Sequence, residues 1–521
     1  MQDSTRMSAD TKPDSGVEGG PQGYATLLER FAEISDLTRA GSLLGWDERT
    51  MMPSAGAVGR AEQLATLSRI GHERLTDDSL WELIEELGSW AESVQGDDRL
   101  EADTVRVARR EAERARRVPV ELRAEMTRAA SLGETAWAAA RGESDFAAYL
   151  PHLERNIELA RRYADCFEPE GHRYDPLLDE YEPGMSTADA RKLLGELRRG
   201  LVPIVAALAE HPDAVDPAPL QGSFDVAGQA RLANRLLGLL PMPDSSWRLD
   251  PTAHPFAAGI ADGDIRLTTR YIEDDLSMSL FSVLHEAGHG IYEAGVPAAL
   301  SRSPVGQLSS LGFHESQSRL WENWVGRSRA FAGLLLPMLR EEFPSRFDAL
   351  GPEQLYRAAN YARPSLIRVE ADEVTYNLHI ALRFELELEL FEGGLEAADL
   401  AEEWNRRTHD YLGIEVPDDA HGVMQDVHWA AGLFGYFPTY SLGNIIAAQL
   451  WEAAAADLGD LEQLIAAAEL ATLGEWLGDR VHRHAARYLP AELAERSLGR
   501  PLDPTPLLRR LGDKYGELYS A

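Results

Sequence analysis

Two histidines and a glutamate form the group in this sequence that is best suited to chemistry. His285, Glu286 and His289 lie within VLHEAGHGIYEAG and make the pattern H-E-x-x-H. Residues four apart share one face of an α-helix, so both imidazoles can reach one metal ion while the glutamate lies beside it. The chemistry would be hydrolysis by a zinc-activated water. Because so short a pattern also arises by chance, its surroundings must agree.

The flanking sequence predicts that the pattern lies in the middle of a helix. Upstream, EDDLSMSLFSVL offers Asp274, Asp275 and Ser277 as N-cap candidates, since short polar side chains accept bonds from the first free N–H groups of a helix. Downstream, Gly295 followed by Pro297 is typical of a helix end. An apolar stripe at helical spacing joins the two ends and consists of Leu280, Val283, Leu284 and Ile291.

Glycines flank the second histidine inside this helix. Gly288 and Gly290 lie on either side of His289. Each costs about 1 kcal/mol relative to alanine in a helix interior. We therefore expect another segment or a ligand to lie close against the backbone there.

A catalytic zinc takes three protein ligands and keeps one position for water, so a third ligand is needed. The extended pattern with a further glycine and histidine is excluded, because those positions hold Tyr292 and Gly295. A carboxylate from a following helix remains, and FHESQSRLWEN contains Glu315 and Glu322. These lie seven apart on one helix face, so spacing does not choose between them, and His314 is a further candidate.

The charge of the chain argues against several classes of partner. Its 86 acidic and 51 basic residues give a formal net charge of -35 at pH 7, which disfavours nucleic acid and anionic membrane surfaces. Only Lys12, Lys192 and Lys514 are lysines, so arginine carries nearly all the positive charge. This composition fits either adaptation to high salt, where charge repulsion is screened, or a genome biased toward arginine codons.

Cysteine content and hydropathy bear on the compartment. The single cysteine, Cys166, excludes an intramolecular disulfide framework, and we expect it to pack as a small hydrophobe rather than act as a nucleophile. The N-terminal residues have no apolar signal-peptide core, and no uncharged apolar run reaches the length of a membrane span. These features predict a cytoplasmic protein.

Most of the chain has the apolar period of helices. Residues 1–22 are rich in Gly, Pro, Ser and Asp and are predicted to be a disordered tail. From Tyr24 onward amphipathic helices follow one another, including a charged one in DTVRVARREAERARRVP and a long one through residues 309–339. Further helices are predicted at 350–390, 395–411, 440–458, 460–479 and 490–518. No repeat or linker divides residues 23–521, so we predict one helical domain.

One region alternates with the period of a β-strand. In GDIRLTTRYI, Ile265, Leu267, Thr269 and Tyr271 alternate with charged or polar residues. We therefore expect a small sheet within residues 246–272, directly before the motif helix. Such a sheet could bind an extended peptide as an added strand, or it could be purely structural.

Six motifs in a fixed order resemble the thermostable carboxypeptidase family, the M32 metallocarboxypeptidases. They are HPF at 254–256, DIRLT at 264–268, HEAGH at 285–289, HESQ at 314–317, IRVEAD at 367–372 and GVMQDVHW at 422–429. LLGWDERTMMP near the start and TPLLRRLGDKYG near the end are similar to the family too. The resemblance covers nearly the whole chain from about residue 22.

This resemblance implies a mainly α, two-lobed body around a deep cleft, with one small β-sheet beside the zinc helix. It implies one Zn²⁺ per chain, with Co²⁺ as a possible substitute, and a homodimer. It selects Glu315 as the third metal ligand beside His285 and His289. Glu322 then becomes a partner for Arg319 or an orienter of a zinc-bound histidine.

The implied activity is hydrolysis of C-terminal residues from peptides, with Glu286 as general base. HWAAGLFGYFPTY offers His428, Tyr436 and Tyr440 as oxyanion donors, because related helical zinc peptidases use a histidine and a tyrosine from such a late segment. Aromatic core packing would account for at least one of the three.

An arginine fork can bind both oxygens of a terminal carboxylate. Arg266 and Arg368 are the candidates because they lie in family motifs, and Arg363 is an alternative. His254 in HPF is expected to face the substrate or to support the residues that do.

Two other functions are open to the same sequence. A helical zinc endo-oligopeptidase would share the metal site but lack an arginine that binds the terminal carboxylate. A catalytically inactive helical scaffold would have no use for Glu286 as a base.

Overall fold

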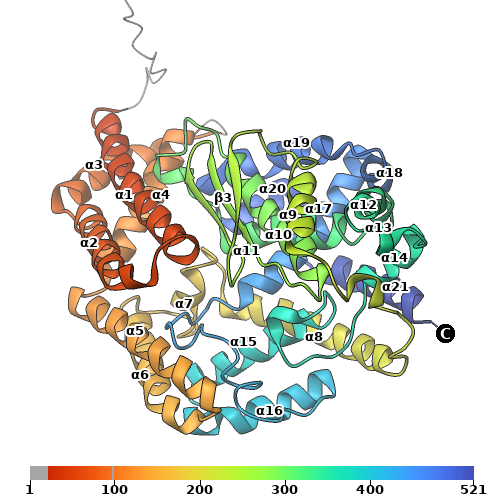
Figure 1. Cartoon of the computed structure of the whole chain (residues 1–521). Helices are drawn as coiled ribbons and strands as arrows, with labels where there is room; N and C mark the ends of the chain where they lie inside the picture. Colours follow the sequence, from red (N-terminus) through yellow and green to blue (C-terminus); the bar gives the residue numbers. More distant parts are fainter. Residues whose placement is uncertain (1–20, 97–98, 521) are drawn as a thin grey trace, which may run out of the picture.

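The computed structural model describes residues 21–96 and 99–520. The predicted tail at 1–22 lies outside the described residues except for its last two positions. The described chain is predominantly helical with one small sheet, as predicted (Figure 1). None of the described helices is both long and apolar enough to cross a membrane.

Four helices at one side of the molecule make a core of their own (Figure 1). They are α1 (Tyr24–Thr50), α2 (Ala57–Leu75), α3 (Asp78–Ser93) and α4 (Leu100–Arg117). Leu27, Phe31, Leu80 and Ile84 are among the buried residues that α1, α3 and α4 contribute. In the charged helix α4, Asp103 is buried and only 15% of the Arg114 side chain is exposed. Arg114 pairs with Asp179 and Glu180, so this charged face is partly a packing surface.

The other elements surround a second, larger core. Before the sheet these are α5 (Val120–Glu143), α6 (Phe146–Asp165), α7 (Asp175–Asp179), α8 (Thr187–Ala209) and α9 (Val226–Leu237). After it come α10 (Leu276–Ala294), α11 (Leu311–Arg319), α12 (Arg329–Glu342), α13 (Pro344–Phe347), α14 (Pro352–Ala359), α15 (Tyr376–Glu392), α16 (Leu400–Leu412), α17 (Pro438–Leu458), α18 (Leu461–Ala466), α19 (Leu470–Arg480), α20 (Pro490–Leu498) and α21 (Thr505–Tyr519).

Short helical turns connect these helices. The 3-10 turns are η1 (Ser54–Gly56), η2 (Ala218–Leu220), η3 (Pro304–Gly306), η5 (Arg368–Glu370), η6 (Ala397–Asp399) and η7 (His482–Arg487). The element η4 (Leu320–Val325) is π-helical and continues directly from α11.

The predicted sheet is present and consists of β1 (Trp247–Pro251), β2 (Ala257–Ala261) and β3 (Asp264–Thr269). The strand order is β1-β3-β2, with β3 parallel to β1 and antiparallel to β2. Of the alternating residues, Ile265, Leu267 and Thr269 are buried, whereas Tyr271 lies beyond the end of β3 and is half-buried. Thr268 is buried too, because its hydroxyl bonds the backbone of Phe256.

Four predicted long helices are wrong because each is interrupted: those at 309–339, 350–390, 460–479 and 490–518. The one at 460–479 consists of α18 and α19, and the one at 490–518 consists of α20 and α21. The one at 309–339 ends with η4 at Val325, and α12 starts again after Ser328, whose hydroxyl accepts a bond from the Phe331 N–H. The one at 350–390 stops at Ala359 and resumes at Tyr376. Pro364 lies in the gap, and a proline disfavours helical backbone at the residue before it.

Candidate metal centre

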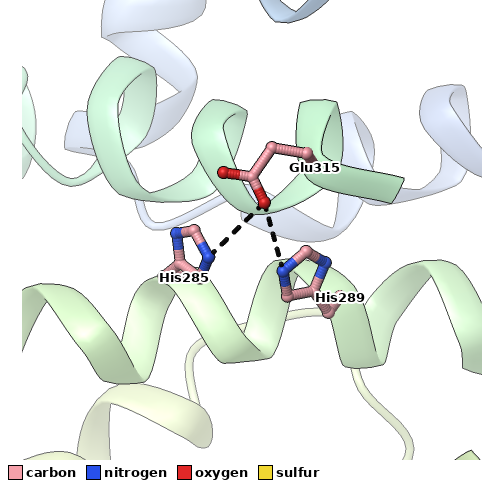
Figure 2. A group of neighbouring side chains, drawn as sticks. All are labelled: His285, His289 and Glu315. Atoms are coloured by element: carbon pink, nitrogen blue, oxygen red, sulfur yellow. Dashed lines mark ion pairs between the residues drawn. The ribbon is translucent and has the colours of Figure 1, made fainter. Parts of the chain in front are cut away.

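Helix α10 carries the two motif histidines. Its N-cap is Asp275, one of the three predicted candidates, whose carboxylate accepts a bond from the Ser277 N–H at 2.8 Å. The helix ends before Gly295, as predicted. His285 and His289 therefore lie one turn apart on the same face, and Figure 2 shows both rings pointing toward Glu315 of the neighbouring helix α11.

One carboxylate oxygen faces both imidazoles. Glu315 Oε2 lies 3.7 Å from Nε2 of His285 and 3.6 Å from Nε2 of His289. The three ligand atoms all lie within 4.8 Å of one another, and among the described residues this is the group of histidine, cysteine or carboxylate side chains that could hold a metal ion. The arrangement joins the residues that the sequence motif and the family resemblance had selected separately.

The second nitrogen of each imidazole is already bonded. His285 Nδ1 lies 2.9 Å from Glu322 Oε2, and His289 Nδ1 lies 3.1 Å from the carbonyl oxygen of His314. Because both partners are acceptors, each Nδ1 carries the proton and each Nε2 presents a lone pair. Two imidazoles oriented by acceptors, plus one carboxylate, make a donor set that fits a catalytic zinc ion.

Close packing of α11 sets the position of Glu315. A Cβ on Gly288 would lie 2.5 Å from the Gln317 carbonyl oxygen, so the glycine lets α11 approach the motif helix. On the other side, a Cβ on Gly443 of α17 would lie 2.6 Å from Glu315 Cβ. Gly290 allows a similar approach to Ile265 of the sheet. The expected close contacts at both motif glycines are therefore present.

Electrostatics differ sharply among the buried acids of the site. Burial raises the pKa of Glu286 to about 7, with His285 opposing the shift. Burial acts on Glu322 in the same direction, but Arg319 and the bond to His285 outweigh it and lower its pKa to about 2. Glu286 is thus able to exchange a proton near neutral pH, while Glu322 stays ionised.

The late aromatic segment forms one cluster. Tyr440 Oη lies 3.2 Å from His428 Nε2, and the rings of Tyr436 and Tyr440 lie 5.4 Å apart. Burial lowers the pKa of His428 to about 3, so its imidazole is neutral. Burial also raises the pKa of Tyr436 to about 12, with Glu315 adding to the shift. These phenols are therefore protonated and close enough to Glu315 to sense its charge.

Arg368 is buried within this aromatic group. Its Nε and Nη2 donate to Asp426 at 3.0 and 2.8 Å, and its Nη1 donates to the Tyr376 hydroxyl at 3.1 Å. The guanidinium also lies 5.0 Å from the Tyr440 ring. Its fork is occupied by protein groups in this structure.

The other predicted substrate residues differ from Arg368 in their exposure and partners. Arg266 on β3 pairs with Asp264 and lies 4.7 Å from the Trp46 ring of α1. His254 is exposed in the connection between β1 and β2. Arg363 is exposed and lies over the Tyr361 ring at 5.8 Å.

Tyr376 and Arg383 are side chains near the site that reasoning from sequence missed. Tyr376 lies under Arg319, with the guanidinium 4.3 Å from its ring, and Arg383 is fully buried against Asp426. Neither has a local sequence signal, because both contacts join segments far apart in the chain. Arg319 was named as a possible partner of Glu322, and its position four residues after Glu315 is also the spacing of a helical ion pair.

Fold and site together define a helical metallopeptidase. The profile of the Carboxypeptidase Taq (M32) metallopeptidase family matches residues 26–515. The chain belongs to this family, as the six motifs predicted.

Individual relatives support the same assignment. The chain is 43% identical to thermostable carboxypeptidase 1 of Thermus thermophilus over 95% of this chain and 99% of that protein. It is 37% identical to carboxypeptidase 1 of Bacillus subtilis over 95% of this chain and 98% of the relative. The crystal structure of the M32 carboxypeptidase from Deinococcus radiodurans superposes with a TM-score of 0.92 at 38% identity, covering 96% of this chain and all of the other.

Proposed function

We propose that this protein is a zinc-dependent carboxypeptidase that removes residues from the C-terminus of peptides. The observation that carries the proposal is the convergence of His285, His289 and Glu315 on one point, in a chain of the M32 family. The names of its relatives give the direction of cleavage, since both are called carboxypeptidases.

The residues present suit zinc better than a hard cation. Two imidazole nitrogens and one carboxylate oxygen match catalytic zinc sites, whereas magnesium prefers oxygen ligands and water. Cobalt can occupy similar nitrogen and oxygen sites and is proposed as a functional substitute. When bound, zinc lowers the pKa of a water ligand and polarises the scissile carbonyl.

Glu286 is the proposed general base. It follows His285 directly, it is buried, and its pKa of about 7 suits proton transfer near neutral pH. In this scheme its carboxylate accepts the proton of the attacking water and then delivers it to the leaving amine. The peptide C–N bond breaks, and each product gains one part of the water molecule.

His428, Tyr436 and Tyr440 are the proposed donors to the oxyanion of the tetrahedral intermediate. The Tyr440 hydroxyl and the His428 imidazole are held together at 3.2 Å, and both are in their neutral, proton-bearing forms. Neutral donors fixed by a protein framework stabilise developing negative charge without having to reorganise.

An arginine and a histidine are proposed to bind the substrate at its terminal carboxylate. Arg266, Arg368 and His254 stay the candidates from the family motifs. Because Asp426 and Tyr376 occupy the Arg368 fork, we infer that Arg368 contributes mainly charge and orientation of the aromatic cluster. Arg363 is exposed and stays the alternative fork for a bidentate contact.

A matched pair of peptides tests the direction of attack. A peptide with a blocked amino terminus and a free carboxylate should be cleaved as fast as its unblocked form, whereas its C-amidated twin should resist. Equal cleavage of the amidated twin would instead favour the helical endo-oligopeptidase. If the metal-loaded protein cleaves neither peptide, the result would favour the non-catalytic helical scaffold.

We also propose that the enzyme acts as a cytoplasmic homodimer. The formal charge of -35 is consistent with peptide substrates and not with nucleic acid or membranes as partners. Light scattering on the purified protein would give the mass of the assembly.

A further inference from the structure

Arg319, the last residue of α11, contacts two of the acids at the metal centre. Its Nε donates to Glu315 Oε1 at 2.6 Å, and its Nη1 donates to Glu322 Oε2 at 3.1 Å. The guanidinium lies 4.3 Å from the Tyr376 ring, and only 12% of the side chain is exposed. The position of the guanidinium is therefore fixed by two carboxylates and by the face of one aromatic ring.

Because of the first of these bonds, the two carboxylate oxygens of Glu315 have different partners. Arg319 occupies Oε1, while Oε2 faces the Nε2 atoms of His285 and His289 at 3.7 and 3.6 Å. Ser318 Oγ lies 3.2 Å from Oε2 and 2.7 Å from the backbone carbonyl oxygen of Glu315, so its one proton can be donated to either acceptor. A carboxylate fixed in this way offers a metal one oxygen rather than two, which leaves space for water.

The second bond connects the guanidinium of Arg319 to His285 through the carboxylate of Glu322. Glu322 Oε2 accepts from Arg319 and also lies 2.9 Å from His285 Nδ1. Arg327 holds the other oxygen of Glu322 at 3.5 Å. A single arginine thus sets the orientation of Glu315 directly and that of His285 through Glu322.

The backbone of this segment supports the arrangement. The π-helical turn η4 starts at Leu320, immediately after Arg319. A π turn is wider than an α turn, so Glu322 is displaced from the position that a continuous α-helix would give it relative to Glu315. Glu315 faces Nε2 of both histidines, and Glu322 faces Nδ1 of His285.

We propose that Arg319 is a positioning residue that holds Glu315 as a one-oxygen metal ligand and couples it to His285 through Glu322. The proposal rests on the proposed function, because it assigns metal-ligand roles to His285 and Glu315. A purely structural ion pair is the competing explanation, since buried pairs of charges often add little net stability or mainly hold elements together.

Arg319→Lys is the main test, because lysine keeps the charge but lacks the planar fork that reaches two acceptors. The matched control is Arg407→Lys, since Arg407 is also buried and also joins two carboxylates, Glu403 and Glu389, by Nε and Nη2. The metal-free proteins are titrated with zinc against a chelating dye, with no peptide present. Loss of an orienting partner typically weakens metal affinity roughly 10- to 100-fold.

We expect Arg319→Lys to bind zinc at least tenfold more weakly and to alter the visible absorption spectrum of the cobalt-loaded protein. Arg407→Lys should bind zinc within about twofold of the wild type. Its partners, Glu403 and Glu389, are not proposed metal ligands, and metal affinity depends on the residues that orient the ligands. Wild-type affinity and an unchanged cobalt spectrum in Arg319→Lys would overturn the proposal. Because no substrate is used, this result is independent of whether the enzyme attacks C-termini.

Glu322→Gln gives a second route if Arg319→Lys folds poorly. The amide still offers His285 an acceptor but loses the charge that Arg319 holds, so zinc affinity should fall here too. Where both single variants fold, their effects in the double variant should be smaller than the sum, because they break one chain of contacts. Unchanged zinc affinity in Glu322→Gln, or strictly additive effects, would contradict the coupling through Glu322.

Discussion

Glu286 and His285 are adjacent in sequence but have different surroundings. The imidazole of His285 is bonded to Glu322 at Nδ1, whereas the carboxylate of Glu286 is buried and its pKa is raised to about 7. Neighbouring residues of one helix can therefore serve as ligand and as base.

Glu286→Gln should abolish most of the activity while leaving the metal bound. The amide has nearly the same size as the carboxylate but cannot accept the proton of water, and general bases contribute roughly 10²- to 10⁴-fold to rates. The measurement is kcat together with the zinc content of the purified variant. Unchanged kcat at full zinc content would remove Glu286 from the mechanism.

At the scale of elements, the site depends on how closely α10, α11 and α17 approach one another. Gly288 of α10 lies against the backbone of α11, and Gly443 of α17 lies against Glu315. Neither position has room for a Cβ. Glycine here has a packing role, which offsets its cost in a helix.

Gly288→Ala should weaken metal binding and destabilise the fold. The new methyl group would lie 2.5 Å from the Gln317 carbonyl oxygen and 2.6 Å from Ser318 Cα, so α11 must move away with Glu315. Overpacking of this kind typically costs about 1–3 kcal/mol. Zinc titration and urea unfolding measure the two effects.

Gly333→Ala in α12 is the matched control for that variant. A Cβ there meets nothing within 4 Å, and the position is exposed. Alanine should stabilise this helix by up to about 1 kcal/mol and leave zinc affinity unchanged. If both alanine variants behave alike, close packing at Gly288 does not position the metal site.

Glu182 connects the start of α11 to the rest of the molecule. It is 1% exposed and accepts a bond from the Gly312 N–H. Burial raises its pKa to about 8, against opposing bonds from Gly312 and Ser310. Because the folded state holds this proton more tightly, the stability present below the unfolded pKa near 4.5 is lost as pH rises toward about 8.

Glu182→Gln should therefore flatten the dependence of unfolding free energy on pH. Glutamine keeps an acceptor but does not ionise, so the slope between pH 5 and 8 should decrease by up to about 1.4 kcal/mol per pH unit. Urea unfolding at several pH values measures it, with the exposed Glu121→Gln as control. Identical slopes in the wild type and Glu182→Gln would show that Glu182 stays ionised in the fold.

At the scale of the whole molecule, local patterns were predictable from sequence and long-range contacts were not. The cap at Asp275, the helix end before Gly295 and the strands around residues 247–269 follow from local periodicity and were confirmed. The breaks after Val325 and Ala359 were missed, because apolar residues continue across them and only Ser328 and Pro364 mark the interruption.

The choice between Glu315 and Glu322 shows the same limit within the site. Both acids lie seven residues apart, and spacing on a regular helix does not separate them. The π-helical turn η4 changes their relative positions, and Glu322 meets His285 Nδ1 while Glu315 faces Nε2 of both histidines. The resemblance to a family supplied what the spacing left open.

Metal dependence and direction of cleavage are the central claims about this molecule, and one measurement tests both. A free-acid peptide is incubated with the metal-free protein, with the zinc-restored protein and with zinc-restored Glu286→Gln, and masses are followed over time. We predict a ladder of successive C-terminal losses from the zinc-restored wild type and an intact peptide in the other two. Internal fragments, N-terminal losses or an equal ladder without zinc would contradict a metal-dependent carboxypeptidase.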